Sequence, residues 1–387
     1  MSSSMTVQAI ERTLDAGLVP FLEGDPGIAK TAMVRQVAES FNLKLIDVRL
    51  MTMDPSDIGG IPMPIEVTQP NGTVVKRMQH VISTLFPIEG DPLPLRLDAN
   101  GNSYDEEEID ANGNIVYLDK AKKKPSMVPA RYDGWLVVFE EITSCVPSMQ
   151  AASYRILLER EVGEYKLHPA VEMIATGNKA TSKAVVVPMS TALRTRMCFI
   201  EVEADHKEWI KWANRNNIDP RVVAYLSWKP ELLNAFDPNI KQLNCAIPRT
   251  WHFASKLMAE DTSNTMEVDP ITERLLKGVI GAASIEFVNF MAYYSQLPKI
   301  SDILKDPKNA DLPTEPGHQY ALTTVLAQEM ATNAKSVKGL VEYTERMSPE
   351  LQTVTYMDAC RKNKSLISNP NIDAWVTANQ DMMSAEI

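Results

Sequence analysis

The chain is poor in the residues that build disulfide frameworks and zinc sites. Its 387 residues include only four cysteines and five histidines. The cysteines lie far apart and form no C-x-x-C pair; they are Cys145, Cys198, Cys245 and Cys360. This scarcity argues against a disulfide scaffold and favours a reducing, cytoplasmic location. The histidines do not cluster, which argues against a His-based metal centre.

Positive charge and long apolar runs are also scarce. The chain has 39 Lys and Arg against 50 Asp and Glu, a net charge of −11. A chain this acidic is not expected to coat nucleic acid through its overall field, although a local basic lining remains an alternative. The most apolar long segment, 278–294, carries Glu286 and Asn289 and is interpreted as a buried helix. The N-terminus lacks the features of a signal peptide, so no membrane association is expected.

Strand and helix patterns alternate along the first half of the chain. Apolar runs typical of buried strands occur at 18–22, 43–48, 135–139, 171–176 and 197–202, and helical patterns at 30–41 and 147–161. Strand, helix and strand at this spacing predict a parallel sheet with right-handed crossovers. After about residue 204 no strand pattern persists, and helices broken by prolines are expected.

Residues 63–130 interrupt this alternation and are interpreted as an insertion of hairpins and loops. Asn71-Gly72 lies between two short apolar runs, which favours a hairpin. The pentapeptide Asp-Ala-Asn-Gly-Asn occurs at 98–102 and again at 110–114. Calcium loops of the EF-hand type place glycine at position six, whereas Gly101 is fourth from Asp98, so turns are the preferred interpretation. Lys120 and Lys122–Lys124 are interpreted as a solvated loop, with a pore lining as the alternative.

A phosphate-binding loop is predicted between the first strand and the first long helix. The segment reads Gly24, Asp25, Pro26, Gly27, Ile28, Ala29, Lys30 and Thr31. It is close to G-x-x-x-x-G-K-[ST], whose backbone N–H groups and helix N-terminus bind phosphates. Lys30 is expected to reach the β and γ phosphates of ATP, and the Thr31 hydroxyl to bind Mg²⁺. Ala29 replaces the second glycine, which a right-handed helical backbone there would tolerate. An ordinary glycine turn is the alternative.

Two acids follow the strand predicted at 135–139. Glu140 is expected to hold Mg²⁺ through its water shell, and Glu141 to orient and activate the attacking water. Glutamate at position 140 is one methylene longer than the usual aspartate, which would alter the metal geometry. A solvated strand end is the alternative, but the upstream phosphate-binding loop favours the functional interpretation.

Three further polar positions are candidate site residues. Asn178 ends the strand at 171–176 and is expected to position water with Glu141, with a turn asparagine as the alternative. Arg194 and Arg196 precede the last strand, where an arginine can project onto the γ phosphate of a neighbouring subunit. Arg249 lies at a predicted helix start and is expected to contact phosphates. For Arg194, Arg196 and Arg249 the alternative is a solvated arginine on the surface.

Several segments occur together in a characteristic order and spacing. They are 24–31, 53–62, 139–142, 150–160, 175–178, 192–196, 247–251 and 281–287. Over roughly residues 8–290 the chain resembles MoxR-type AAA+ ATPases. The resemblance implies a hexameric ring with ATP between subunits, Asn178 as sensor 1, Arg196 as an arginine finger in trans and Arg249 as sensor 2. It also implies chaperone-like remodelling and a von Willebrand factor A domain protein as partner.

The sequence therefore predicts an α/β P-loop NTPase with three parts. Residues 1–204 form the parallel-sheet core, 205–295 a helical lid and 296–387 a variable helical segment. The expected activity is Mg²⁺-dependent ATP hydrolysis that remodels a protein partner. One alternative is an ATP-binding structural switch with little hydrolysis. Another is a DNA-acting motor or loader, against which the acidity counts.

Overall fold

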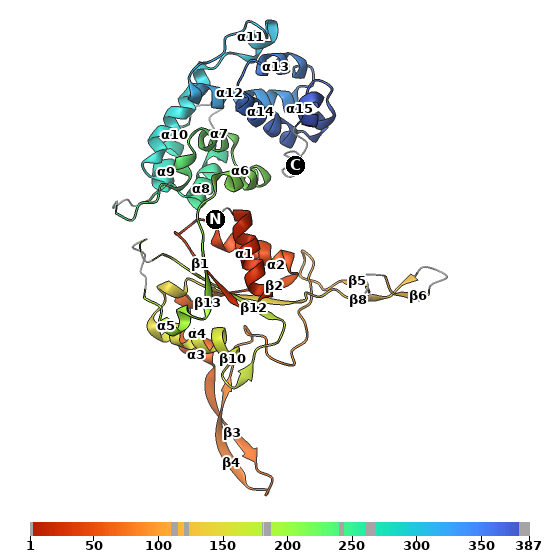
Figure 1. Ribbon diagram of the computed structural model, residues 1–387, viewed down its shortest axis with the longest axis vertical. Coiled ribbons are helices and arrows are strands. Elements are labelled where there is room, and N and C mark those ends of the chain that lie inside the picture. The colour runs from red at the N-terminus through yellow and green to blue at the C-terminus, as the bar shows by residue number, and fades with distance from the viewer. Residues whose placement is uncertain are drawn as a thin grey trace. The chain divides into compact units, whose positions relative to one another are not determined.

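The computed structural model describes residues 3–109, 115–119, 124–179, 181, 187–239, 244–260 and 268–378. The chain divides into two compact units. The first contains Ser3–Pro26 and Lys30–Glu203, and the second contains Gly27–Ala29 and the chain from Ala204 onward. Figure 1 labels the helices and strands of both. The sheet and most candidate site residues belong to the first unit.

A five-stranded sheet forms the centre of the first unit, in the order β13-β1-β12-β9-β2. Its strands are β1 (Val19–Glu23), β2 (Leu43–Arg49), β9 (Gly134–Glu140), β12 (Val171–Gly177) and β13 (Met197–Glu201). Every pairing in this sheet is parallel, which confirms the prediction. β9 is buried from Gly134 to Phe139, as expected for a strand covered on both faces.

Helices cover both faces of this sheet (Figure 1). They are α1 (Ser3–Asp15), α2 (Lys30–Ser40), α3 (Pro55–Gly59), α4 (Pro147–Glu159) and α5 (Thr191–Arg194), with 3₁₀ turns at Leu50–Thr52 and Ile142–Ser144. Apolar side chains of α4, including Met149 and Ile156, pack with Phe21, Val137 and Phe139 in one buried cluster. This packing fixes the strands whose carboxyl ends carry the candidate site.

The predicted insertion consists of hairpins and loops. Its strands are β3 (Ile61–Thr68), β4 (Val74–Val81), β5 (Asp105–Glu107), β6 (Tyr117–Asp119), β7 (Lys124–Pro125) and β8 (Met127–Pro129). Each pairs antiparallel: β3 with β4, β5 with β8 and β6 with β7. A fourth hairpin, β10 (Glu161–Val162) with β11 (Tyr165–Lys166), follows α4.

Turns were predicted at three places in the insertion, and the structure describes two of them. The Asn71-Gly72 hairpin is confirmed, with Thr68 paired to Val74 and Gly72 at φ 81°. Asp98 forms a turn, because its carboxylate accepts the backbone N–H groups of Asn100 and Asn102, both at 2.9 Å. The second pentapeptide, 110–114, and the lysines at 120, 122 and 123 lie outside the described residues.

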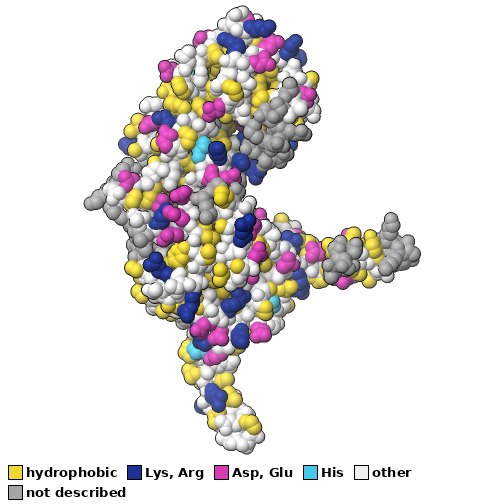
Figure 2. Space-filling view, in the orientation of Figure 1, with side chains coloured by type: hydrophobic (Ala, Val, Ile, Leu, Met, Phe, Trp, Pro, Cys, Tyr) yellow, Lys and Arg dark blue, Asp and Glu magenta, His cyan; other side chains and the backbone are white. Residues whose placement is uncertain are grey.

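The β3–β4 hairpin exposes apolar side chains on its surface, and Figure 2 shows them among polar atoms. Ile61, Val74, Met78 and Val81 are each between 55% and 59% exposed. The base of the hairpin is held by His80, whose backbone N–H and ring Nδ1 both contact the Glu164 carboxylate. The rest of the hairpin therefore depends mainly on its own ladder for its shape.

The second unit is helical throughout its described residues. Its helices are α6 (His206–Arg215), α7 (Pro220–Trp228), α8 (Pro248–Ala259), α9 (Pro270–Ile280), α10 (Ala283–Ala292), α11 (Ile300–Lys305), α12 (Pro316–Thr332), α13 (Val337–Thr344), α14 (Pro349–Lys362) and α15 (Asp373–Ala378), with 3₁₀ turns at Pro230–Asn234, Tyr293–Gln296 and Lys364–Ser368. α12 packs against both α7 and α14. One apolar cluster is centred on Tyr225 and Trp251, and another on Leu326 and Tyr343.

The prediction of one buried helix over 278–294 is wrong. α9 ends at Ile280 and α10 begins at Ala283, because Gly281 adopts φ 60° and ψ −133°. A Cβ on Gly281 would lie 2.3 Å from the Asn244 carbonyl oxygen, so the close approach requires glycine. The burial was predicted correctly, since Phe287 and Phe290 are fully buried. Within the part of the chain that the structure describes, no helix has the length and apolar character needed to cross a bilayer.

Candidate active site

The loop between β1 and α2 turns tightly at the carboxyl end of the sheet. The Gly24 N–H donates to the Gly177 carbonyl oxygen of β12 at 3.3 Å, which joins the loop to the sheet. Gly27 has a φ of 76°, in the left-handed region that glycine adopts readily. Ala29 has a φ of 71° and lies in the same region, so the right-handed helical backbone that would tolerate an alanine is not present there. An L-residue there costs about 1–2 kcal/mol, which explains why glycine is usual at this position.

Lys30 begins α2 and folds its side chain back over the loop. Its Nζ donates to the carbonyl oxygens of Gly24 and Asp25, at 2.7 and 3.0 Å, and to Asn178 Oδ1 at 3.2 Å. The ammonium group is therefore surrounded by oxygen acceptors from two strand ends. Phosphate oxygens are stronger acceptors for a cation than neutral carbonyl oxygens, so a phosphate can replace some of these contacts.

Thr31 and Glu140 meet although 109 residues separate them. The Thr31 hydroxyl donates to Glu140 Oε1 at 2.9 Å. While it donates its proton, the hydroxyl oxygen keeps lone pairs that can face a cation. Both residues are partly buried. They come together because the carboxyl ends of β1 and β9 lie at the same edge of the parallel sheet.

This pair of oxygen donors fits magnesium. Mg²⁺ prefers hard oxygen ligands and is usually held by one or two protein groups together with phosphates and water. Among the residues that the structure describes, no group of three or more His, Cys, Asp or Glu side chains could hold a metal ion. Thr31 and Glu140 would thus supply the protein's share of the ligands, with the remainder from a nucleotide.

Glu141, directly after Glu140, is exposed to solvent. Its backbone has φ 56° and ψ 40°, a left-handed conformation that is strained for a glutamate. Its N–H donates to the Thr176 hydroxyl at 3.2 Å, which holds the turn to the end of β12. The two successive acids therefore have different surroundings: the carboxylate of Glu140 contacts Thr31, and that of Glu141 is exposed.

Asn178 is buried next to this turn, with 6% of its surface exposed. Its N–H donates to the Thr143 hydroxyl at 2.9 Å, the reverse of the bond from Glu141 to Thr176. Gly177 permits the close packing, because a Cβ there would lie 2.7 Å from Thr143 Cγ2. The turn after β9 and the end of β12 are thus joined by two crossed hydrogen bonds.

Sequence reasoning missed Arg49, which ends β2 beside the acids. Arg49 pairs in register with Glu140, and its Nε lies 2.9 Å from Asp47 Oδ2 and 3.9 Å from Glu140 Oε2. The hydrogen bond with Asp47, and next the charges of Asp47 and Glu140, raise the pKa of the Arg49 guanidinium. The available signal was its position at the end of a predicted parallel strand. Thr143 and Thr176 were missed in the same way.

Another ion pair lies at this edge of the sheet. Lys179, directly after Asn178, donates to Glu201 Oε1 at 2.5 Å. This hydrogen bond raises the pKa of the Lys179 ammonium and lowers the pKa of the Glu201 carboxyl. The charges of Glu201, Asp25 and Glu203 also raise the pKa of Lys179, which shows that several acids lie near this ammonium group.

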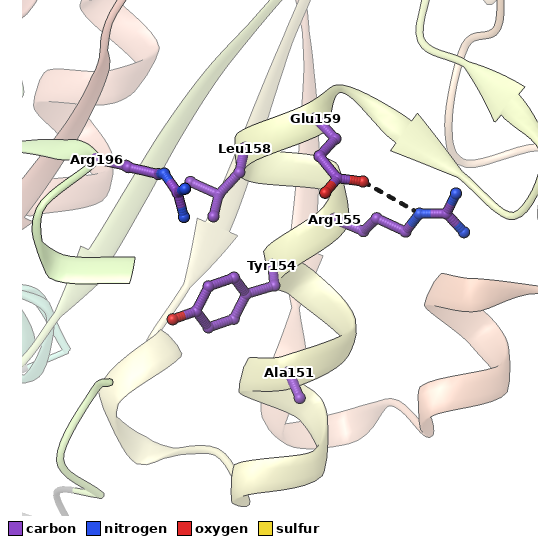
Figure 3. Close-up of a pocket in the computed structure, with 6 residues that line it drawn as sticks. All are labelled: Ala151, Tyr154, Arg155, Leu158, Glu159 and Arg196. Atoms are coloured by element: carbon purple, nitrogen blue, oxygen red, sulfur yellow. Dashed lines mark hydrogen bonds and ion pairs between the residues drawn. The ribbon is translucent and has the colours of Figure 1, made fainter. Parts of the chain in front are cut away.

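Arg196 belongs to a separate surface of the first unit. With side chains of α4 it lines an open pocket of about 360 Å³; the other lining residues are Ala151, Tyr154, Arg155, Leu158 and Glu159. Arg155 is bound to Glu159 and Glu161, and in Figure 3 its guanidinium points away from Arg196. The backbone N–H of Arg196 donates to the Leu193 carbonyl oxygen at 3.2 Å, but its side chain is exposed and has no hydrogen bond or ion pair with another described residue. The neighbouring Arg194 lies over the Phe199 ring, 6.0 Å from its centroid.

Arg249 lies in the second unit, in the first turn of α8. Pro248 starts this helix at a first-turn position, as predicted. The Arg249 backbone N–H donates to the Gly27 carbonyl oxygen at 3.3 Å. Gly27–Ala29 also belong to the second unit, so this hydrogen bond lies within it. Its side chain is exposed.

The strand order, the loop between β1 and α2 and the acids that end β9 define an α/β P-loop NTPase fold. No family model and no curated protein matches the chain. Among solved structures, a Cytophaga hutchinsonii protein provisionally described as an ATPase has 13% identity and a TM-score of 0.31, over 100% of this chain and 88% of that one. NtrX from Brucella abortus has 12% identity and a TM-score of 0.37, over 92% and 68%. Likenesses this distant carry no argument about function.

Proposed function

We propose that the protein is a Mg²⁺-dependent ATPase of the AAA+ type. The observation that carries the proposal is the contact between the Thr31 hydroxyl and Glu140 Oε1, beside the Lys30 ammonium. It combines a phosphate-binding cation, two metal-binding oxygens and an acid at one edge of a parallel sheet. This combination is what phosphoryl transfer from a bound nucleoside triphosphate requires.

Each side chain has a definite task in this proposal. Lys30 exchanges its carbonyl partners for phosphate oxygens, and the N–H groups of the loop bind the same phosphates. Thr31 and Glu140 hold Mg²⁺, which neutralises charge on the phosphates. Glu141 accepts a proton from the attacking water, since its exposed carboxylate is free of the metal-binding pair. The Asn178 amide orients that water and stays fixed by its bond to Lys30.

A role for Arg196 in a neighbouring subunit is part of the proposal. An exposed arginine beside an open pocket can stabilise negative charge that another chain presents. On the likeness to MoxR-type proteins we propose a hexameric cytoplasmic ring, with Arg249 as a further phosphate contact. Chaperone-like remodelling and a von Willebrand factor A domain partner are proposed on the same ground.

The backbone of Ala29 supports a second candidate function. The left-handed conformation at an alanine makes the phosphate-binding loop costlier to form than a glycine loop. A chain with such a loop can bind ATP as a structural switch and hydrolyse it little. Steady-state phosphate release from the wild-type protein separates the two functions, because sustained release occurs only in the ATPase.

The decisive experiment compares Lys30→Ala with Arg35→Ala, which removes an exposed cation from the same helix. Lys30 makes several charged hydrogen bonds with phosphates, so its loss should cost about 3 kcal/mol, or about 100-fold in ATP affinity. Isothermal titration calorimetry measures both variants against the wild type. Unchanged ATP affinity in Lys30→Ala would exclude a phosphate-binding loop at 24–31, and Arg35→Ala should bind like the wild type.

A further inference from the structure

Glu140 has a different partner for each of its two carboxylate oxygens. Oε1 accepts a hydrogen bond from Thr31 at 2.9 Å, and Oε2 lies 3.9 Å from Arg49 Nε. Arg49 comes from β2, the strand that pairs with β9, and the two residues are direct partners in the register. The carboxylate is thus held from α2 on one side and from the neighbouring strand on the other.

The Arg49 guanidinium is itself anchored. Its Nε donates to Asp47 Oδ2 at 2.9 Å, and Asp47 stands two residues earlier on the same strand, so both side chains lie on the same face. The Arg49 side chain is 67% exposed. A contact this exposed contributes little to folding stability, so its main effect is on orientation.

A glutamate needs such an orienting contact more than an aspartate does. Glu140 has one more rotatable bond than the aspartate usual at this position, and a free carboxylate would sample several rotamers. Groups that hydrogen-bond a metal-binding side chain typically change metal affinity by about 10–100-fold when they are removed. The Arg49 contact is an ion pair longer than a hydrogen bond, so we expect an effect at the lower end of that range. The contact with Arg49 can therefore compensate for the extra rotatable bond of Glu140.

We propose that Arg49 is a positioning residue for Glu140. By facing Oε2, it holds the carboxylate so that Oε1 meets Thr31, and it thereby sets the Mg²⁺ affinity of the nucleotide site. This inference rests on the proposed function, because it concerns the metal of the same site. It assigns Arg49 no contact with nucleotide or water.

The test uses Arg49→Gln in the full chain, with Lys44→Gln as the matched control, since Lys44 is an exposed cation on the same strand. Calorimetry gives ATP affinity in EDTA, and Mn²⁺ titration followed by electron paramagnetic resonance gives metal affinity with ATP bound. Arg49→Gln should keep ATP affinity in EDTA and weaken the metal constant about 10-fold, while Lys44→Gln changes neither. Arg49→Lys should recover part of the loss. A metal constant that is unchanged, or tighter because a positive charge is gone, overturns the inference.

A double-mutant cycle with Glu140→Asp separates orientation from a general structural effect. The shorter aspartate draws its carboxylate away from Arg49, so Arg49→Gln should change the metal constant less than 2-fold in that background, roughly the limit of additivity. The same 10-fold loss in both backgrounds would contradict the positioning role. A wild-type chain that binds no ATP overturns the proposed function together with this inference. ATP binding in EDTA with an unaltered metal constant in Arg49→Gln overturns only the inference.

Discussion

The two groups of candidate catalytic side chains in the first unit differ in how they are partnered. At the end of the sheet, Lys30 contacts three oxygens, Thr31 contacts Glu140, and Asn178 is buried. The Arg196 side chain is exposed beside an open pocket and has no polar partner among the described residues. Groups that are already oriented can stabilise charge without reorganisation, whereas an unpartnered arginine needs a charge from elsewhere. This difference supports the proposal that a second chain completes the site with its Arg196.

The comparison is tested most strongly by Arg196→Ala. If Arg196 acts on a neighbour's nucleotide, turnover should fall about 10³-fold while ATP affinity stays within about 2-fold of the wild type. Phosphate release and calorimetry give the two values. Arg194→Ala is the control, because its guanidinium lies over the Phe199 ring, and it should have a much smaller effect. Normal hydrolysis by Arg196→Ala would remove Arg196 from the site.

Mixing two inactive variants sharpens the same point. Lys30→Ala should bind ATP about 100-fold more weakly but keeps Arg196, and Arg196→Ala should bind ATP but lacks the proposed finger. A mixed oligomer contains interfaces with an intact Lys30 on one side and an intact Arg196 on the other. Mixing should therefore restore part of the turnover, measured by phosphate release. If mixtures of the two variants stay inactive at every ratio, Arg196 does not act on the nucleotide bound by a neighbouring chain.

Glu141→Gln should have the next largest effect. Replacing the carboxylate removes the proton acceptor but keeps the shape of the side chain, so turnover should fall about 10²-fold with ATP affinity preserved. Glu39→Gln, an exposed acid at the end of α2, serves as the control for lost charge. Undiminished phosphate release in Glu141→Gln would assign the water to another base. Weakened ATP binding would show that Glu141 contributes to nucleotide binding and not only to turnover.

Ala29→Gly should have the smallest effect, on stability. Glycine relieves about 1–2 kcal/mol of strain at φ 71° but adds up to about 1 kcal/mol of freedom to the unfolded chain, for a net gain of about 0.5–1 kcal/mol. Urea unfolding measures it. Ala32→Gly, in the first turns of α2, should destabilise by about 0.5–1 kcal/mol instead. A loss of stability in Ala29→Gly would show that the loop gains from alanine in some other way.

The sequence predicted the sheet and the meeting of Glu140 with Thr31. Buried strands such as 135–139 are continuous apolar runs, and the carboxyl ends of parallel strands lie at one edge of their sheet. This reasoning brings Thr31 and Glu140 together without any contact being visible in the sequence. It also predicted the β3–β4 hairpin, because Asn-Gly suits its turn.

The features that sequence reasoning missed depend on register and on single backbone angles. Arg49 faces Glu140 only because β2 and β9 pair at that position, which the pattern of either strand leaves open. Alanine at position 29 suits a right-handed backbone, but the sequence does not give the backbone angle, and the loop ends in a left-handed residue. Gly281 lies inside an apolar stretch without a nearby proline, so the break between α9 and α10 gave no signal.

The crossed hydrogen bonds between Thr143 and Asn178 and between Glu141 and Thr176 have a mechanical consequence. Each turn donates one backbone N–H and accepts one through a threonine hydroxyl. Neither turn can shift alone without breaking both bonds, so Glu141 and Asn178 are expected to move together. If the chain hydrolyses ATP as proposed, any motion that follows must carry both turns as a whole or originate elsewhere, in the loop that precedes α2.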